Sequence, residues 1–297
     1  MIMLRLMGGL GNQLFQYSVG RALAIQHNTS LKLDLNLLLD RTAIEHRVFR
    51  DFELADFPIQ AELATEKEAS FFHPKRDTFF QKVGAKVHTF LHSPNVYIES
   101  DMRYDSSVSL LPNDTCLVGN FQSEQYFSGI ETELRKELTL DLPLSREVLA
   151  LKEEMETTNS VALHVRRGDY VSNPLFSRTL GALPLEYYYE ALSYLEKNIP
   201  SFKVFIFSDD PNWCRGNMDL DYPFYIVADK VSGEKAHKKD MMLMGACKHY
   251  ILSNSSFAWW GAWLNPSSTK IVLAPKTWYR SPEIDDRDIV PKPWHKI

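Results

Sequence analysis

Apolar residues recur along the second half of the chain in short runs that are separated by longer stretches with helical spacing. The runs predict β-strands at 161–165, 203–208, 223–228, 250–253 and 270–274. The stretches between them predict α-helices at 185–198, 211–217, 237–248 and 255–264. Strands that alternate with helices in this way predict a doubly wound parallel sheet, because buried parallel strands form continuous apolar runs.

The first half of the chain begins with the same alternation but is less regular. Strands are predicted at 2–6, 31–35, 95–99 and 116–120, and helices at 13–27, 123–138 and 146–157. The glycine-rich segment GGLGN at 8–12 predicts a turn, and residues 139–145 predict a linker. The order of elements within 41–93 stays open, and the proline-rich tail PKPWHKI predicts irregular chain. The length allows one large or two medium domains, and with two the linker would divide the chain into residues 1–145 and 146–297.

Composition narrows the class of protein. The 297 residues are 44% hydrophobic and 24% charged, which is typical of globular domains, and the length exceeds one typical core. The net charge of -5 argues against nucleic acid as a partner, because phosphate backbones require a basic face. Cys116, Cys214 and Cys247 are far apart and predict reduced thiols. No apolar stretch is long enough to predict a transmembrane helix.

Polar residues follow four of the predicted strands in the second half. HVRRGD follows 161–165, FSDD ends the next strand, VADK the third, and SNSS follows the strand at 250–253. Ligands of open α/β sheets bind beyond the carboxyl ends of the strands. Several polar strand ends in one sheet therefore predict a binding site at that edge.

The segment HVRRGD supplies the first candidate residues. In extended chain, His164 and Arg166 point to one side and Arg167 to the other. We expect Arg166 to face a phosphate, which a planar guanidinium binds through two N–H groups, and Arg167 to be structural. Gly168 would allow close backbone approach. The alternative is a surface pair of arginine and aspartate beside a core histidine.

Two predicted helix starts carry further candidates. Asn254, Ser255 and Ser256 stand at the start of a predicted helix, whose N-terminus could bind an anion; the alternative is simple capping. Asp240 is expected in the first turn of its helix, where it would either interact with the helix dipole or accept two N–H groups of a guanine edge.

GGLGNQ is a weaker signal. It lacks the complete G-x-G-x-x-G fingerprint and is not a P-loop, because no GK[ST] follows. Its glycines could simply form a strand–helix turn. Asn12 and Gln13 would then cap the helix or bind a hydroxylated ligand.

Four segments together carry a family resemblance: GGLGNQLFQY, HVRRGDYV, FSDD and DMMLMGACKHYILSNSSFAWWGAWL. On these motifs, which span Gly8 to Leu264, the chain resembles the bacterial α-1,2-fucosyltransferases of glycosyltransferase family 11, which are related to the mammalian blood-group H enzymes. The resemblance implies two Rossmann-like domains that face each other across a cleft, the GT-B type of fold. It also implies GDP-fucose as donor, inversion at the sugar carbon, and no metal or other cofactor.

The resemblance assigns roles to residues. Arg166 would hold the β-phosphate, and His164 would approach the nucleotide. Asp240 would match the acidic residue that reads guanine, because it stands 256 − 240 = 16 positions before Ser256. The candidate donor-binding residues are Asp240, Asn254, Ser255, Ser256, Ser208 and Asp209; the candidate catalytic residues are Arg166, His164 and Asp169; and the candidate acceptor- or fucose-binding residues are Asn12 and Gln13.

The implied reaction transfers L-fucose to the 2-hydroxyl of a terminal galactose in an oligosaccharide or lipid-linked glycan, in the synthesis of a bacterial surface polysaccharide such as O-antigen. The Golgi relatives begin with a membrane anchor and this chain begins with a strand, so we expect a cytoplasmic enzyme with at most peripheral membrane contact. Asp169 is either the general base or an ion-pair partner of an arginine. Two other functions stay open: a GDP-sugar transferase with a different acceptor, and a non-catalytic nucleotide- or glycan-binding module.

Overall fold

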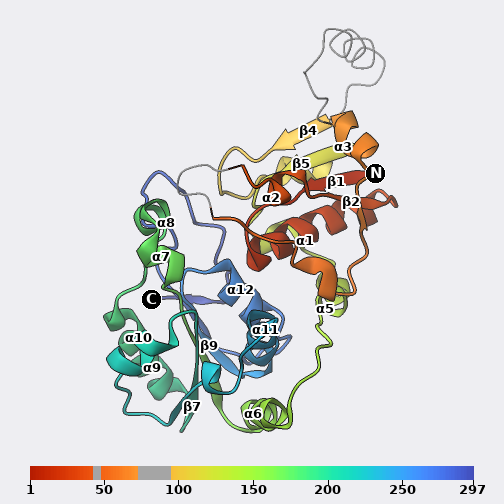
Figure 1. The fold of residues 1–297 in the computed structure, drawn as a ribbon. Helices are drawn as coiled ribbons and strands as arrows, with labels where there is room; N and C mark the ends of the chain where they lie inside the picture. Colours follow the sequence, from red (N-terminus) through yellow and green to blue (C-terminus); the bar gives the residue numbers. More distant parts are fainter. Residues whose placement is uncertain (43–47, 73–94) are drawn as a thin grey trace. The chain divides into compact units, whose positions relative to one another are not determined.

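The computed structural model describes residues 1–42, 48–72 and 95–297. The chain divides into two compact units, Met1–Glu137 and Leu138–Ile297 (Figure 1). This division precedes the domain boundary expected at 145/146 and assigns the linker at 139–145 to the second unit. Most of the segment 41–93, whose order the sequence leaves open, lies outside the described residues.

The N-terminal unit contains a five-stranded parallel sheet with the order β3-β2-β1-β5-β4. Its strands are β1 (Ile2–Arg5), β2 (Leu31–Asp34), β3 (Glu62–Leu63), β4 (Asn95–Ile98) and β5 (Thr115–Val118). Its helices are α1 (Leu10–Gln26), α2 (Asn36–Leu39), η1 (Leu54–Asp56), α3 (Glu66–Phe72), η2 (Ser106–Leu110), η3 (Glu124–Phe127) and α5 (Glu131–Glu137). The strand order reverses between β1 and β5, which makes their carboxyl ends a topological switch point.

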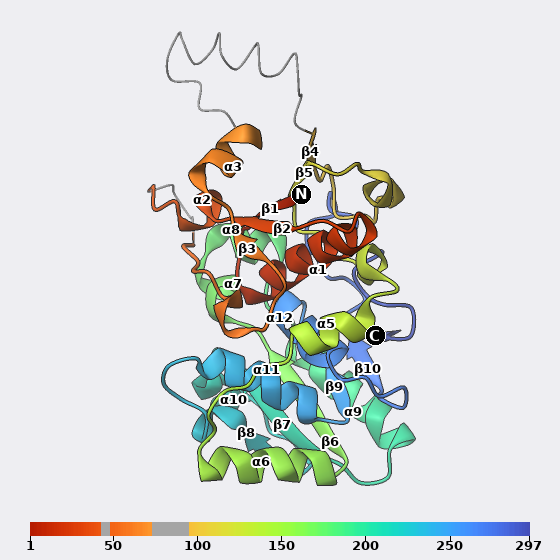
Figure 2. The same ribbon diagram turned by 90° about the vertical axis from the view of Figure 1, so that its right-hand side faces the viewer.

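Helices cover both faces of this sheet, with α1 on one side and α3 on the other (Figure 2). Gly20 of α1 packs so closely on Leu4 that an added Cβ would lie 2.6 Å from a leucine methyl. On the opposite face, Phe72 of α3 packs with Met3 and Cys116 in a buried cluster. This two-sided burial accounts for the apolar runs that predicted the strands.

The C-terminal unit contains a six-stranded parallel sheet with the order β11-β10-β9-β6-β7-β8. Its strands are β6 (Ser160–Val165), β7 (Lys203–Ser208), β8 (Phe224–Ile226), β9 (His249–Ile251), β10 (Val272–Ala274) and β11 (His295–Lys296). Numbered from β6, this order is the 3-2-1-4-5-6 arrangement of the Rossmann fold. The predicted fold class of two Rossmann-like α/β units is therefore confirmed. The switch point of this sheet lies between β6 and β9.

The helices of this unit are α6 (Arg146–Thr157), α7 (Gly168–Ser172), α8 (Pro174–Thr179), α9 (Leu185–Asn198), α10 (Pro211–Asn217), η4 (Val227–Asp229), α11 (Ala236–Ala246) and α12 (Ser256–Trp263). In Figure 1, α9 and α10 lie on one face of the sheet, and α11 and α12 lie on the other. All six residues of β6 are buried between these layers. β6 is thus the central strand from which the site is built.

Three segments differ from the sequence-based predictions. The helix expected at 123–138 is instead η3 and α5, interrupted near Gly129, whose φ of +95° no right-handed helix accommodates. The tail is not irregular throughout, because His295 and Lys296 form β11 beside β10. Its prolines precede these residues, so the N–H groups needed for strand pairing are present. Helices α7 and α8 were not predicted; Asn173 separates them and caps α8 through its side chain.

Candidate active site

His164 and Ser253 join the carboxyl ends of β6 and β9, at the switch point of the C-terminal sheet. The Nδ1 atom of His164 lies 2.7 Å from the Ser253 hydroxyl, and both residues are buried. Burial, with a smaller contribution from the charge of Arg166, lowers the pKa of His164 to about 3. At neutral pH the imidazole is therefore uncharged, and it can act on a ligand by hydrogen bonding but not as a cation.

Arg166 is held by two carboxylates. Its guanidinium lies 2.6 Å from an oxygen of Asp169 and 3.1 Å from an oxygen of Asp209. The register of the sheet explains the second contact: Val165 of β6 pairs with Ser208 of β7, so Arg166 and Asp209 follow at adjacent positions. Burial alone would lower the pKa of Arg166, but Asp209 and Asp169 outweigh it and raise the pKa. The side chain stays charged and keeps 25% of its surface exposed.

Arg167 is directed toward α10 and not toward the switch point. Its guanidinium lies 3.9 Å from the ring centroid of Trp213 and 3.3 Å from an oxygen of Asp210. Its backbone N–H donates to Asp209, which therefore contacts both arginine residues. A Cβ on Gly168 would lie 2.4 Å from the same Asp209 carboxylate. The close approach expected at Gly168 is thus an approach to Asp209.

The N-terminus of α12 is fixed by Asn254. The side-chain amide of Asn254 donates to the carbonyl oxygens of Leu180, Gly181 and Trp278, at 3.1 to 3.2 Å. Ser255 is the N-cap residue, is buried, and makes no capping hydrogen bond with its side chain. Simple capping by Ser255 therefore does not account for its position, and Ser256 follows as the first residue of α12. The segment keeps the features of an anion-binding helix start.

Asp240 is half-buried on α11, and its buried Oδ1 atom has no hydrogen-bond partner among the described residues. Burial raises the pKa of this carboxyl to about 7, against a lowering effect of His237. The first turn of α11 contains no acidic residue, because the helix begins at Ala236 after Lys235 in the left-handed conformation. The expected first-turn position of Asp240 is therefore wrong, and a helix-dipole role loses its basis. An unpaired buried carboxylate oxygen is instead available for N–H donors.

The side chains of Ser208, Gln13 and Asn12 form hydrogen bonds within the protein. The Ser208 hydroxyl accepts the N–H of Asp210 at 3.0 Å. In the N-terminal unit, Gln13 is fully buried, donates to the carbonyl oxygens of Gly8 and Asp51, and accepts the N–H of Glu53. Both amide hydrogens of Gln13 are thus used within the protein. Asn12 accepts a hydrogen bond from Gln122 at 2.9 Å.

The family model "Glycosyl transferase family 11" matches residues 86–297, which is more than half of the chain. The chain belongs to glycosyl transferase family 11. An alpha-1,2-colitosyltransferase of Escherichia coli is 30% identical over 300 residues, which cover 100% of this chain and 98% of that protein. The O-antigen biosynthesis glycosyltransferase WbnK of Escherichia coli is 32% identical over 92% of this chain and 93% of its own. The galactoside alpha-(1,2)-fucosyltransferase 2 of Gorilla gorilla gorilla is 29% identical over 53% of this chain and 47% of its own.

In this family 11 chain, sequence reasoning missed Tyr170, which lies between Arg166 and Asn254. The ring centroid of Tyr170 is 5.3 Å from the Arg166 guanidinium, and its hydroxyl donates to the Asn254 carbonyl oxygen. The signal was available in HVRRGDY, because Tyr170 stands four positions after Arg166. This spacing indicates a contact only if residues 168–172 form helix α7, which brings the Tyr170 ring back to Arg166.

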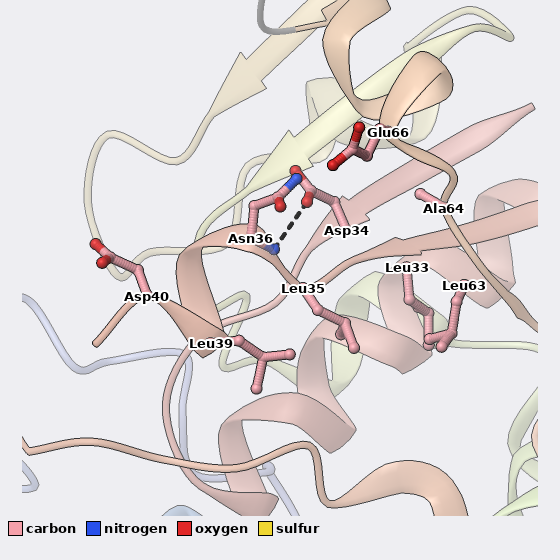
Figure 3. A pocket seen from close by; sticks show the side chains of 9 residues that line it. All are labelled: Leu33, Asp34, Leu35, Asn36, Leu39, Asp40, Leu63, Ala64 and Glu66. Carbon is pink, nitrogen blue, oxygen red and sulfur yellow. Dashed lines mark hydrogen bonds between the residues drawn. The ribbon is translucent and has the colours of Figure 1, made fainter. Parts of the chain in front are cut away.

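A cavity of about 500 Å³ opens at the carboxyl ends of β2 and β3 in the N-terminal unit. Figure 3 shows Asp34, Asn36 and Glu66 turned toward one another beside leucine side chains. Asp34 is almost fully buried, and its carboxylate accepts the N–H of Asn36 and pairs with Arg5. The lining residues are Leu33, Asp34, Leu35, Asn36, Leu39, Asp40, Leu63, Ala64 and Glu66. The volume lies in the range of small-molecule sites.

Within 1–42, 48–72 and 95–297, no group of three histidine, cysteine, aspartate or glutamate side chains is arranged to hold a metal ion. Over the same residues, no helix has the length and apolar character needed to cross a membrane.

Proposed function

We propose that this family 11 glycosyltransferase transfers L-fucose from GDP-fucose to the 2-hydroxyl of a terminal galactose, with inversion at the sugar carbon. One pair of observations carries the proposal: at the switch point a charged Arg166 is fixed by two carboxylates, and on α11, which packs against α12, a buried carboxylate oxygen of Asp240 lacks a donor among the described residues. The fixed guanidinium of Arg166 suits a diphosphate, and the unpaired carboxylate oxygen of Asp240 suits a nucleobase that carries N–H groups. The motifs HVRRGD and SNSS and the galactoside fucosyltransferase relative support the sugar and the acceptor.

The proposed reaction is a direct displacement. The acceptor hydroxyl oxygen forms a bond to the fucose anomeric carbon as the bond from that carbon to the β-phosphate oxygen breaks, the electron pair of the broken bond leaves with GDP, and the hydroxyl proton passes to water. The transition state is oxocarbenium-like, and negative charge grows on GDP. Arg166 and the N-terminus of α12 would stabilise that charge as preorganised electrostatics. Asp169 would orient Arg166, because its carboxylate lies 2.6 Å from the guanidinium.

Incubation with GDP-fucose and lactose is the direct test, and we expect fucosyl-lactose to form at the same rate with and without EDTA. The reason is that Arg166 and the helix N-terminus would supply the charge stabilisation that a divalent cation supplies elsewhere. Mass spectrometry of the product and the initial rates give the readout. Loss of transfer in EDTA with recovery on adding Mg²⁺ would contradict the metal-independent scheme.

The same experiment separates the alternatives. GDP binding without turnover would support a non-catalytic module, and turnover with other acceptors only would support a different GDP-sugar transferase. One second candidate is the transfer of colitose. It is favoured because a colitosyltransferase is 30% identical to this chain over its whole length. A nucleotide-activated colitose should therefore be compared with GDP-fucose as donor, at equal concentrations and with the same acceptor.

For the acceptor, we favour the cavity at β2 and β3 over Gln13, whose amide hydrogens are already donated to backbone. Sugar hydroxyls donate to carboxylate and amide oxygens, and leucines contact the C–H face of the ring. Replacing Glu66 with glutamine or Asn36 with alanine should raise KM for lactose about tenfold, the effect of one lost hydrogen bond to a charged or polar group. KM for GDP-fucose should stay unchanged.

Glu62→Gln is the matched control for this prediction. Glu62 lies on the neighbouring strand and pairs with Lys32 but does not line the cavity. The Glu62→Gln variant should leave KM for lactose and KM for GDP-fucose unchanged. Saturation-transfer NMR with lactose measures acceptor contact independently of turnover. Equal lactose signals for wild type, Asn36→Ala and Glu66→Gln would contradict the assignment.

We further propose a cytoplasmic role in surface-polysaccharide synthesis, in which the acceptor is a lipid-linked glycan and membrane contact is peripheral. The similarity to WbnK, whose name refers to O-antigen biosynthesis, supports the pathway. Fractionation of expressing cells tests the location. Recovery of the protein in the membrane fraction after high-salt washing would contradict a peripheral association.

A further inference from the structure

Tyr170 contacts the two elements to which the proposed mechanism assigns charge stabilisation. It is the buried residue of α7, with 9% of its surface exposed. Its ring centroid lies 5.3 Å from Cζ of Arg166, a cation–π distance. Its hydroxyl donates to the carbonyl oxygen of Asn254, two residues before α12, at 3.1 Å. One rigid side chain thus spans from the guanidinium to the segment that opens α12.

The carbonyl that Tyr170 contacts is itself immobilised. Asn254 is 1% exposed, and its amide donates to three backbone carbonyl oxygens from two other segments, at 180–181 and at 278. Gly181, with φ of +65°, lies against the Arg280 guanidinium, where a Cβ would be 2.5 Å from Cζ. The position of the Asn254 carbonyl is therefore set by packed backbone on several sides.

We infer that Tyr170 is a positioning residue, which fixes the Arg166 guanidinium relative to the N-terminus of α12 so that both act on one diphosphate. This inference rests on the proposed function of Arg166. Asp169 of α7 and Asp209, which follows β7, hold the guanidinium through ion pairs, whereas α12 follows β9, so action on one diphosphate also needs a connection from the guanidinium to the start of α12. Tyr170 supplies that connection, and displacements of about 1 Å at a reacting centre are enough to cost about a hundredfold in rate.

Replacing Tyr170 with phenylalanine removes the hydroxyl and keeps the ring under Arg166. We expect kcat for transfer from GDP-fucose to fall about tenfold, with KM for GDP-fucose within about twofold, because the charge that binds the donor stays in place. Tyr170→Leu also removes the cation–π contact and should lower kcat by about another tenfold. Both values are taken per folded molecule, counted by GDP binding in calorimetry.

Tyr187→Phe is the matched control. Tyr187 is 8% exposed, and its hydroxyl donates at 2.6 Å to the carbonyl oxygen of Leu252, in the same segment between β9 and α12. The Tyr187→Phe variant therefore loses the same kind of buried hydrogen bond to a backbone carbonyl oxygen as Tyr170→Phe. The two phenylalanine variants should lose similar amounts of thermal stability, but only Tyr170→Phe should lose kcat. A merely structural role of Tyr170 would lower Tm and leave kcat per folded molecule unchanged.

Two results distinguish a failure of the Tyr170 positioning role from a failure of the proposed fucosyl transfer. Wild-type transfer from GDP-fucose supports the proposed function whatever the variants do. With that activity present, kcat of Tyr170→Phe equal to that of wild type and of Tyr187→Phe would overturn the positioning role alone. A selective loss of kcat in Tyr170→Phe supports it.

Discussion

Replacing Arg166 with glutamine should lower kcat for fucosyl transfer about 100- to 1000-fold. Charge grows on the departing diphosphate, and removal of one preorganised donor from such a site costs about 3 to 4 kcal/mol of transition-state stabilisation. Because Arg166 would also contact the donor before reaction, KM for GDP-fucose should rise as well. Arg166→Lys keeps the charge but not the planar pair of N–H groups, so its kcat should fall between those of glutamine and wild type. Initial rates at saturating lactose measure these effects.

Arg167→Gln is the control for the charge change. Arg167 is adjacent in sequence and contacts Trp213 and Asp210 of the α10 region. Its loss should lower stability and leave kcat within about threefold of wild type. The phosphate role of Arg166 is wrong if both glutamine variants lose activity equally, or if Arg166→Gln keeps near-normal turnover.

The Rossmann-like fold of each unit could be predicted because its central strands, such as β1 and β6, are buried on both faces. β6 has no exposed residue, and α6, α9 and α10 have the bounds that helical spacing predicted. Elements without such periodicity were missed. β11 has two residues, and α7 and α8 have five and six, which is less than two turns. β11 forms because it pairs with β10, and α8 begins where the Asn173 side chain caps it. Neither interaction leaves a hydrophobic pattern in the local sequence.

The candidate site was partly predictable for the same reason. Strand ends carry polar residues, and the sequence identifies them once the strands are assigned. The partners of those residues depend on strand order, which the sequence did not give. Asp209 reaches Arg166 because β7 is the neighbour of β6, and Ser253 reaches His164 because β9 lies on the other side. The placement of Asp240 needed the true start of α11, which Lys235 sets by its left-handed backbone.

The network around Arg166 also explains why a guanidinium is suited to this position. Asp169 and Asp209 take up two of its nitrogen atoms, and the ring of Tyr170 contacts the cation. A lysine ammonium could not keep two carboxylates in a fixed plane and still present further donors to a phosphate. The carboxylates set the orientation, and the exposed quarter of the side chain remains available for a ligand.

Replacing Asp240 with asparagine should weaken GDP binding about 100-fold. Two hydrogen bonds from a guanine edge to a carboxylate contribute about 1.5 to 3 kcal/mol each, and the amide that replaces the carboxylate presents only one acceptor atom. Inosine diphosphate, which lacks the exocyclic amine of guanine, isolates one of these bonds. Wild type should bind it at least tenfold more weakly than GDP, and Asp240→Asn should bind the two nucleotides with similar affinity. Calorimetric titration measures all four dissociation constants.

GDP affinity of the wild type should also depend on pH in a way that Asp240 determines. Burial raises the pKa of this carboxyl to about 7, so in the free protein it is protonated below that pH and ionised above it. A carboxylate that accepts two N–H groups must be ionised, so GDP binding is linked to loss of the proton. Kd should rise about tenfold for each pH unit below 7 and level off above it, and Asp240→Asn should remove this dependence. A wild-type Kd that stays constant between pH 5.5 and 8 would mean that Asp240 does not bind the base.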